Sequence, residues 1–209
     1  MSATAGAAVT GHAKAREWAK RLGEVGVWTI DLDRLPVAAA REYLRALESL
    51  GFGALWIGEG LGSREAFANA AVLLAASQRL IIATGIANIW ARDAIAMANG
   101  ARTLVDAYPD RFLLGIGVSH APTVKMRGRM YGRPVEHMRE YLDAMDAAPY
   151  VGPKVDAPRV LAALGPRMLR LAGERALGPI PISSRSSTRP SHAKSSARVR
   201  SSPWSRPPS

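Results

Sequence analysis

Four polar side chains, those of Glu59, Asn88, Ser119 and His120, come just after apolar runs of the kind that form buried strands. Carboxylate, amide, hydroxyl and imidazole groups can orient a ligand, and the carboxylate and the imidazole can also transfer a proton. In parallel α/β folds, ligands bind at the carboxyl ends of the strands. We therefore take these four residues as candidates for a ligand site.

Two of the four candidates have a structural interpretation beside the functional one. Glu59 ends an apolar run within Trp-Ile-Gly-Glu-Gly, where a carboxylate is costly to bury without a partner. It either faces a cleft or forms a structural salt bridge. His120 is either a catalytic group or a local hydrogen-bonding residue, and the sequence alone leaves both questions open. His12 and His137 fall in predicted helices, which we expect to lie far from this edge of the sheet.

Composition and spacing exclude several kinds of site. The chain has no cysteine, which excludes disulfides and thiolate catalysis, and its four histidines lack metal-ligand spacing, so we expect no metal site. No phosphate-binding loop and no serine elbow occur. Gly115 and Gly117 let a backbone or a ligand approach closely, but no third glycine opens a helix as in a dinucleotide fingerprint.

Short apolar runs alternate with segments of helical periodicity, and these elements must position the candidates. The predicted strands are 25–30, 54–58, 80–84, 112–117 and 159–163, and the predicted helices are 12–22, 35–50, 63–76, 92–108, 135–147 and 166–175. Continuously apolar strands are typical of a parallel α/β sheet covered on both faces. Five βα units fit either an open doubly wound sheet or most of a (β/α)8 barrel. Because a complete barrel usually takes about 250 residues, length alone favours the open sheet.

The chain has 209 residues and a net charge of +11, which is unevenly distributed. Residues 177–209 hold six Lys and Arg, no Asp or Glu, 11 serines and six prolines, so we expect a disordered basic tail. The other residues carry only +5, which gives little support for a specific nucleic-acid partner. We divide the chain into an N-terminal extension and helix (1–24), a folded unit (25–176) and the tail (177–209).

Neither a membrane span nor a secretion signal is predicted. No stretch approaches the roughly 18 consecutive apolar residues of a membrane helix, and residues 1–10 lack the basic start of a signal peptide. We therefore expect no membrane partner and a cytoplasmic location.

Four segments together resemble the luciferase-like monooxygenase superfamily and, within it, the branch of oxidoreductases that depend on the deazaflavin coenzyme F420. The segments are LGFGALWIGE, RLIIATGIANIWARDAIAMANGARTLVDAYPDRFLLGIGVSHAP, YGRPVEHMREYLDAM and RVLAALGPRMLRLAGERA. The resemblance implies an incomplete (β/α)8 TIM barrel of about five βα units over 25–176, which reverses the preference from length. It also implies an enzyme that transfers a hydride between an organic substrate and the deazaflavin.

The resemblance also implies roles for particular residues. The cofactor-binding residues that it implies are Gly85, Ile86, Asn88 and Ser119. In this family the third strand often ends in a bulge with a non-prolyl cis peptide that backs the cofactor ring, and Gly85 and Ile86 match that place. Glu59 and His120 then become candidate catalytic residues, as polar groups that face the substrate.

Two departures from the family pattern stand out. Gly60 lies where some deazaflavin dehydrogenases have a catalytic histidine, so their proton-transfer chemistry is not carried over. The family also continues through three more βα units, with loops that hold the cofactor phosphate. No such pattern follows residue 176, so we expect a C-terminally truncated barrel. The composition of the tail is typical of high-GC coding DNA read out of frame, which predicts a one- or two-base slip near 176–178.

Two rival functions stay open. One is a monooxygenase on the same fold that depends on flavin mononucleotide (FMN). The other is a non-catalytic fragment, because an incomplete barrel keeps an open sheet edge that another chain would have to cover. The partners that we expect are a small-molecule substrate and, in a homodimer, a second copy of the chain.

Overall fold

Five parallel strands form the centre of the molecule in the computed structural model, which describes residues 3–180 and 197–200. They are β1 (Val25–Thr29), β2 (Ala54–Gly58), β3 (Ile81–Asn88), β4 (Phe112–Gly117) and β5 (Arg159–Leu161). Neighbouring strands are consecutive in the chain, in the order β5-β4-β3-β2-β1. This order is that of a (β/α)8 barrel and not of a doubly wound sheet, where the strand order reverses. The fold that the resemblance implied is confirmed, against the preference from length.

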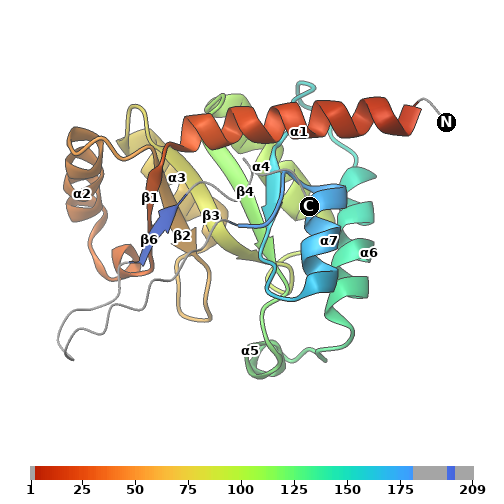
Figure 1. Cartoon of the computed structure of the whole chain (residues 1–209). Helices are drawn as coiled ribbons and strands as arrows, with labels where there is room; N and C mark the ends of the chain where they lie inside the picture. The colour runs from red at the N-terminus through yellow and green to blue at the C-terminus, as the bar shows by residue number, and fades with distance from the viewer. Residues whose placement is uncertain (1–2, 181–196, 201–209) are drawn as a thin grey trace.

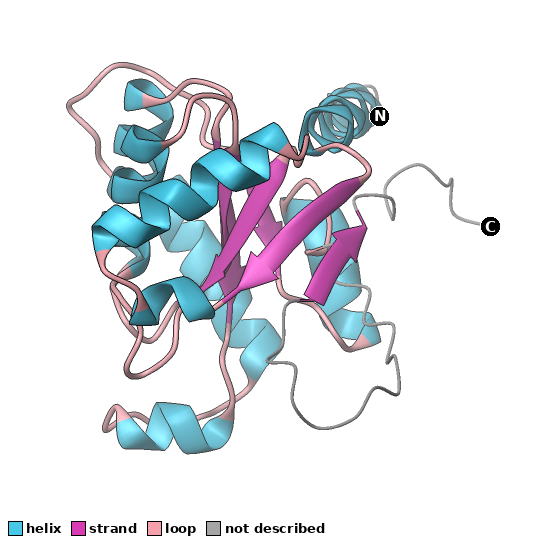
Figure 2. Ribbon diagram, turned by 90° about the vertical axis from the view of Figure 1, so that its left-hand side faces the viewer, coloured by secondary structure: helices cyan, strands magenta, loops and turns pink. Residues whose placement is uncertain are grey.

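Helices connect the strands and cover the sheet. The helices of the described residues are α1 (Ala3–Leu22), the 3-10 helix η1 (Asp31–Arg34), α2 (Val37–Ser49), α3 (Ala66–Ala76), α4 (Ala94–Ala107), α5 (Ala121–Met126), α6 (Pro134–Asp146) and α7 (Pro166–Arg175). Helix α1 crosses one end of the sheet, and α5 projects beyond the opposite end (Figure 1 and Figure 2). Because α5 directly follows β4, the end at which it projects is the carboxyl end of the strands.

Apolar side chains pack on both faces of the sheet, in two clusters. Leu55 and Ile57 of β2 point into the first cluster, which lies between the sheet and the helices α2, α3, α4, α6 and α7. Trp56, between them in sequence, points into the second cluster together with Trp18 and Leu22 of α1. Successive side chains of a strand point to opposite faces, so a strand buried on both faces reads as a continuous apolar run.

The chain keeps regular structure beyond residue 176, where we expected disorder to begin. The backbone N–H of Leu177 donates to the carbonyl of Arg159, and that of Ile180 donates to the carbonyl of Leu161. Ile180 is buried in the second cluster. Residues 177–180 therefore form backbone hydrogen bonds with the free edge of β5 and pack on this apolar face. The composition of the segment did not indicate either contact.

A second segment of the expected tail is also regular: β6 (Ala197–Arg200) pairs antiparallel with β1. The expectation of disorder is therefore corrected for 177–180 and 197–200. Residues 181–196 and 201–209 lie outside the described residues, and the out-of-frame origin of the tail stays a prediction. No helix within the described ranges is both long enough and apolar enough to cross a membrane.

Candidate functional site

A bulge interrupts β3 near its carboxyl end. Ile57 of β2 lies opposite Thr84, whereas the next residue, Gly58, lies opposite Ile86, so Gly85 is the extra residue. The register with β4 also shifts, between Ala83 and Ala87. A bulge bends a strand and redirects its side chains, and bulges are frequent next to active sites. The bulge that the resemblance implied at Gly85 and Ile86 is present, but no peptide bond in the described part of the chain is cis.

The two glycines of β4 allow the bulge to approach. A Cβ added at Gly115 would lie 1.9 Å from the carbonyl oxygen of Thr84, and one added at Gly117 would lie 2.5 Å from Cγ2 of Ile86. The Thr84 hydroxyl donates to the Gly115 carbonyl (2.9 Å) and accepts from the Gly115 N–H (2.8 Å). Of the two uses predicted for these glycines, the structure therefore supports backbone approach.

The side chain of Trp28 covers Gly85. A Cβ added at Gly85 would lie 2.3 Å from Nε1 of Trp28 and 3.2 Å from the carbonyl oxygen of Ile57. Nε1 of Trp28 is buried and has no hydrogen-bond partner. A buried donor without a partner typically costs about 1–3 kcal/mol, so the indole gains nothing from hydrogen bonding at this place. The family resemblance implies a cofactor ring at this place, and the structure has the Trp28 indole in that space.

Glu59 forms a buried ion pair with Arg92. The side chains of Glu59 and Arg92 are only 5% and 10% exposed, and both terminal guanidinium nitrogens of Arg92, Nη1 and Nη2, donate to the carboxylate. The same carboxylate accepts from the backbone N–H of Asn88 (2.7 Å), and Arg92 also binds Glu65 (2.6 Å). Of the two interpretations of Glu59, the structure supports the salt bridge, which fixes the end of β3.

Hydrogen bonds and neighbouring charges shift the pKa values of Arg92 and Glu65 in the directions that favour their charged forms. Burial alone would lower the pKa of Arg92, but its hydrogen bonds and proximity to Glu59 and Glu65 outweigh burial and raise that pKa above its ordinary value. Burial alone would raise the pKa of Glu65, yet the backbone N–H groups of Ala68 and Phe67, together with Arg92, lower it below the usual value. The pKa of Tyr141, whose hydroxyl donates to the Arg92 carbonyl (2.9 Å), is raised well above normal by burial.

Asn88 and Ser119 lie at the ends of neighbouring strands. The Asn88 side chain is buried, and its Oδ1 accepts from the backbone N–H of Trp90 (2.9 Å). Ser119 has a positive φ of 57°, and its carbonyl accepts from the hydroxyl of Tyr131 (3.3 Å). Nε1 of Trp90 donates to the carbonyl of Val118 (2.9 Å), which ties the loop after β3 to the loop after β4.

Of the histidines, His137 and not His120 packs into this end of the molecule. His120 is exposed, and its Nε2 lies 3.0 Å from Oγ1 of Thr123, which supports the local hydrogen-bonding interpretation. His137 stacks on Trp90 with ring centroids 4.4 Å apart. The expectation that His137 lies far from this edge is wrong. His137 lies in the first turn of α6. Because helices that follow parallel strands begin at the carboxyl end of the sheet, its place in the predicted helix could have indicated this position.

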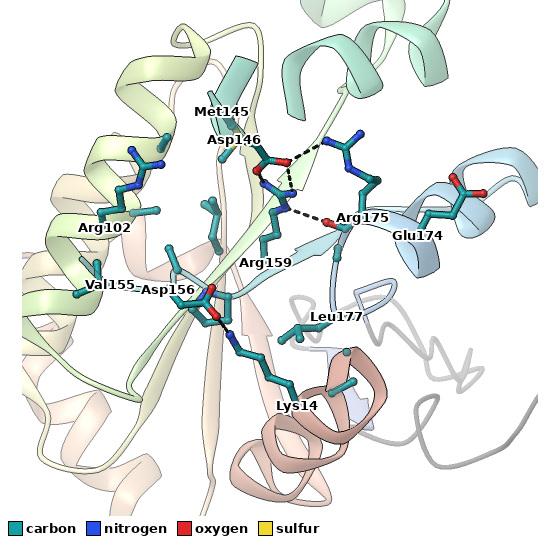
Figure 3. Close-up of a pocket in the computed structure, with 18 of the residues that line it drawn as sticks. Lys14, Arg102, Met145, Asp146, Val155, Asp156, Arg159, Glu174, Arg175 and Leu177 are labelled. Atoms are coloured by element: carbon teal, nitrogen blue, oxygen red, sulfur yellow. Dashed lines mark hydrogen bonds and ion pairs between the residues drawn. The ribbon is translucent and has the colours of Figure 1, made fainter. Parts of the chain in front are cut away.

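Two cavities flank the sheet at opposite ends. The smaller, of about 340 Å³, lies beside Trp90 and is lined by Trp90, Met130, Gly132, Arg133, Glu136, His137 and Glu140. The larger, of about 880 Å³, lies among α1, the carboxyl ends of α6 and α7 and the start of β5 (Figure 3). Two of the arginines that line it, Arg159 and Arg175, both pair with Asp146 (Figure 3). The described residues contain no group of three or more side chains that could hold a metal ion.

Comparison with known proteins identifies the family. Residues 21–200 match the model of the luciferase-like monooxygenase family. The chain belongs to this family. The match runs through the same strands and loops that form the bulge and the ion pair, and it continues past residue 176.

Two curated relatives are named as a reductase and as an oxidoreductase. A 5,10-methylenetetrahydromethanopterin reductase of Methanolobus tindarius is 26% identical over 157 residues, which is 66% of this chain and 48% of that protein. A putative coenzyme F420-dependent oxidoreductase of Mycobacterium tuberculosis is 32% identical over 103 residues, which is 49% of this chain and 29% of that protein. The chain thus spans half or less of the length of these relatives.

Solved structures of the same fold include enzymes of both cofactor classes. A coenzyme F420-dependent tetrahydromethanopterin reductase from Methanopyrus kandleri has a TM-score of 0.60 at 18% identity, covering 73% of this chain and 54% of that chain. An F420-dependent secondary alcohol dehydrogenase has a TM-score of 0.62 at 21% identity, covering 69% and 54%. An FMN-bound monooxygenase from Pseudomonas putida has a TM-score of 0.52 at 16% identity, covering 58% and 38%.

Proposed function

We propose that this chain binds coenzyme F420 at the bulge of β3 and is a coenzyme F420-dependent oxidoreductase of the luciferase-like monooxygenase family. The observation that carries the proposal is the family match over residues 21–200, which includes the bulge at Gly85. The name of a curated relative and the names of two solved structures of the same fold specify F420. When bound, a deazaflavin supplies a carbon centre that accepts or donates hydride, and the protein supplies orientation and a dry surface.

We propose that a planar ring lies against the bulge. Ile86 is half-buried on the side of the second cluster, and Ser119 lies at the end of the neighbouring strand. A ring against Gly85 would take the place of the Trp28 indole. Because Nε1 of Trp28 has no hydrogen-bond partner, the indole would lose no hydrogen bond on leaving. Gly85, Ile86 and Ser119 are therefore the residues that we propose to contact the ring.

Glu59, Asn88 and His120 have different proposed roles. The Glu59 carboxylate is used by Arg92 and by the Asn88 backbone, so we assign to it the positioning of the β3 end. The Asn88 amide shapes the turn to Trp90 beside the ring. His120 is the polar group of this set that is exposed, and it is available to a substrate at the mouth.

An FMN-dependent monooxygenase is the second candidate, since one solved structure of the same fold holds FMN. Titration of the purified chain with each cofactor distinguishes the two. We expect the fluorescence anisotropy of coenzyme F420 to rise to saturation at micromolar protein, and the FMN signal to saturate only at far higher protein concentration. Tight FMN binding with no F420 binding would reverse the assignment. Absence of binding by either would favour the non-catalytic alternative.

A further inference from the structure

The larger cavity, of about 880 Å³, lies at the amino ends of the strands, opposite the bulge, and the proposed function does not use it (Figure 3). Its volume is that of a small-molecule site, which typically measures about 300–1,000 Å³. One wall of the cavity is apolar and consists of buried side chains, those of Ala98 and Ala101 in α4, Leu114 in β4 and Met145 in α6. The cavity therefore offers a ligand an apolar surface beside its charged groups.

The Lys, Arg, Asp and Glu side chains that line this cavity are paired, with one exception. The ion pairs are Lys14 with Asp156, both Arg159 and Arg175 with Asp146, and Glu174 with Arg139. Arg102 also lines the cavity, and it forms no ion pair with any residue that the structure describes. The cavity therefore contains one positive charge that no carboxylate of the described chain neutralises, and a ligand with a single negative charge would balance it.

The guanidinium group of Arg102 is held in one place by its neighbours. Its Nη1 donates to Oδ1 of Asn99 (3.0 Å) and to the carbonyl of Ala148 (3.0 Å), and the group lies over the ring of Tyr150, 5.4 Å from the centroid. Arg102 is half-buried, and its Nη2 has no hydrogen-bond partner among the described residues. A guanidinium that is already fixed loses little conformational entropy when it binds an anion, so Nη2 is a preorganised donor.

We propose that this cavity binds an amphipathic monocarboxylate, with its carboxylate on Arg102 and its alkyl chain against Ala98, Ala101 and Met145. Guanidinium groups bind carboxylates through charge-assisted hydrogen bonds, and burial of the alkyl chain on the apolar wall adds affinity. A ligand with two negative charges would place the second one near Asp146 with no free cation to balance it. The site lies at the end of the sheet opposite the bulge, so the inference goes beyond the proposed function and does not depend on it.

The test measures the binding of sodium octanoate to the full chain by isothermal titration calorimetry. Two further probes separate the parts of the ligand: octan-1-ol has the alkyl chain without the charge, and acetate has the charge without the chain. Arg102→Gln removes the positive charge from the cavity. Arg64→Gln is the matched control, because Arg64 is also half-buried, donates to a backbone carbonyl, that of Leu35, and forms no ion pair within the described ranges. Arg64 follows β2, at the other end of the sheet.

We expect the wild type to bind one octanoate per chain, and to bind octan-1-ol and acetate about tenfold more weakly or worse, because each lacks one of the two recognised parts. Arg102→Gln should bind octanoate about tenfold more weakly than the wild type, and Arg64→Gln should match the wild type. The inference is overturned if the wild type shows no saturable octanoate binding, or if it binds octanoate and octan-1-ol equally well. Wild-type affinity for octanoate in Arg102→Gln also overturns it.

A second variant decides the question if Arg102→Gln does not fold. Gly173 of α7 lines the cavity, and a Cβ added there has no atom within 4 Å, so Gly173→Leu should place a side chain in the cavity without a backbone clash. We expect this variant to have the circular dichroism spectrum of the wild type and to bind octanoate about tenfold more weakly, because its leucine takes up room for the alkyl chain. A folded Gly173→Leu protein with wild-type affinity for octanoate overturns the inference.

Discussion

The sequence around Glu59 indicates that its carboxylate has a partner or a function, but it does not indicate which residue the partner is. A carboxylate at the end of an apolar run predicted either a partner or a functional use, and the structure supplies the partner, Arg92, whose side chain reaches it from 33 positions further along the chain. No pattern within a short stretch of sequence can reveal a contact between two residues so far apart in the chain. The same holds for Trp28, because its contact with Gly85 depends on how β1 and the bulged β3 lie around β2.

The ion pair of Glu59 and Arg92 yields a prediction on stability. Glu59→Ala should lower the free energy of unfolding by about 3 kcal/mol or more, because it leaves the Arg92 charge buried with only the half-exposed Glu65 as partner. Glu59→Ala with Arg92→Ala should cost less than the sum of the single variants. Urea unfolding of the four proteins measures the coupling, and strictly additive losses would show that the pair is not coupled.

Gly115 yields a second prediction at the same scale. Gly115→Ala should destabilise the protein by about 3 kcal/mol or more, because the added Cβ meets the Thr84 carbonyl, a backbone atom that cannot move without breaking the bulge. Gly173→Ala is the matched control, since Gly173 lies in α7 with no atom near the added Cβ. The control should stabilise by about 0.5–1 kcal/mol. Similar melting temperatures for both variants would contradict this account of the bulge.

At the scale of elements, periodicity predicted each of the five parallel strands and the long helices between them. It missed the last four residues of β3, which follow Thr84. This part of the strand forms only because Gly115 and Gly117 leave room for the bulge. It also missed α5, which has only six residues and lies within a glycine-punctuated segment. Elements that form through contacts distant in sequence, or that last little more than a turn, have no periodic signal.

Glu48, in the last turn of α2, joins that helix to the start of β3. Its carboxylate accepts from the backbone N–H groups of Gln78 (2.9 Å) and Leu80 (3.0 Å), and also from that of Arg79. Partial burial alone would raise the pKa of Glu48, but these amides outweigh it, so the pKa lies below its ordinary value of 4.5. A carboxylate with a lowered pKa in the folded state stabilises the fold above its unfolded pKa, and this contribution is lost as the pH falls through the folded value.

Glu48→Gln should therefore destabilise the protein at pH 7 by about 1 kcal/mol, a modest value because solvent screens this half-buried group. The difference between variant and wild type should shrink as the pH falls from 5 toward 3. Melting temperatures of both proteins across that range provide the measurement. A difference in melting temperature that stays constant with pH would show that the ionised form of Glu48 does not stabilise the fold.

At the scale of the whole molecule, the described sheet has the strand order of the first five units of a barrel, with 177–180 beside β5 and β6 beside β1. The homodimer and the small-molecule substrate stay predictions. If a second copy covers the sheet edges, sedimentation equilibrium should give twice the chain mass of 22.3 kDa at micromolar concentration. A constant monomer mass up to about 100 μM would contradict the dimer.

The affinity of Gly85→Ala for coenzyme F420, measured by anisotropy well below the melting temperature, tests whether the bulge at Gly85 holds the cofactor ring. The added methyl group would occupy the surface proposed for the ring, so we expect binding at least tenfold weaker than in the wild type. Gly173→Ala, far from the bulge, should bind as the wild type does. A folded Gly85→Ala protein with wild-type affinity for coenzyme F420 would contradict the account.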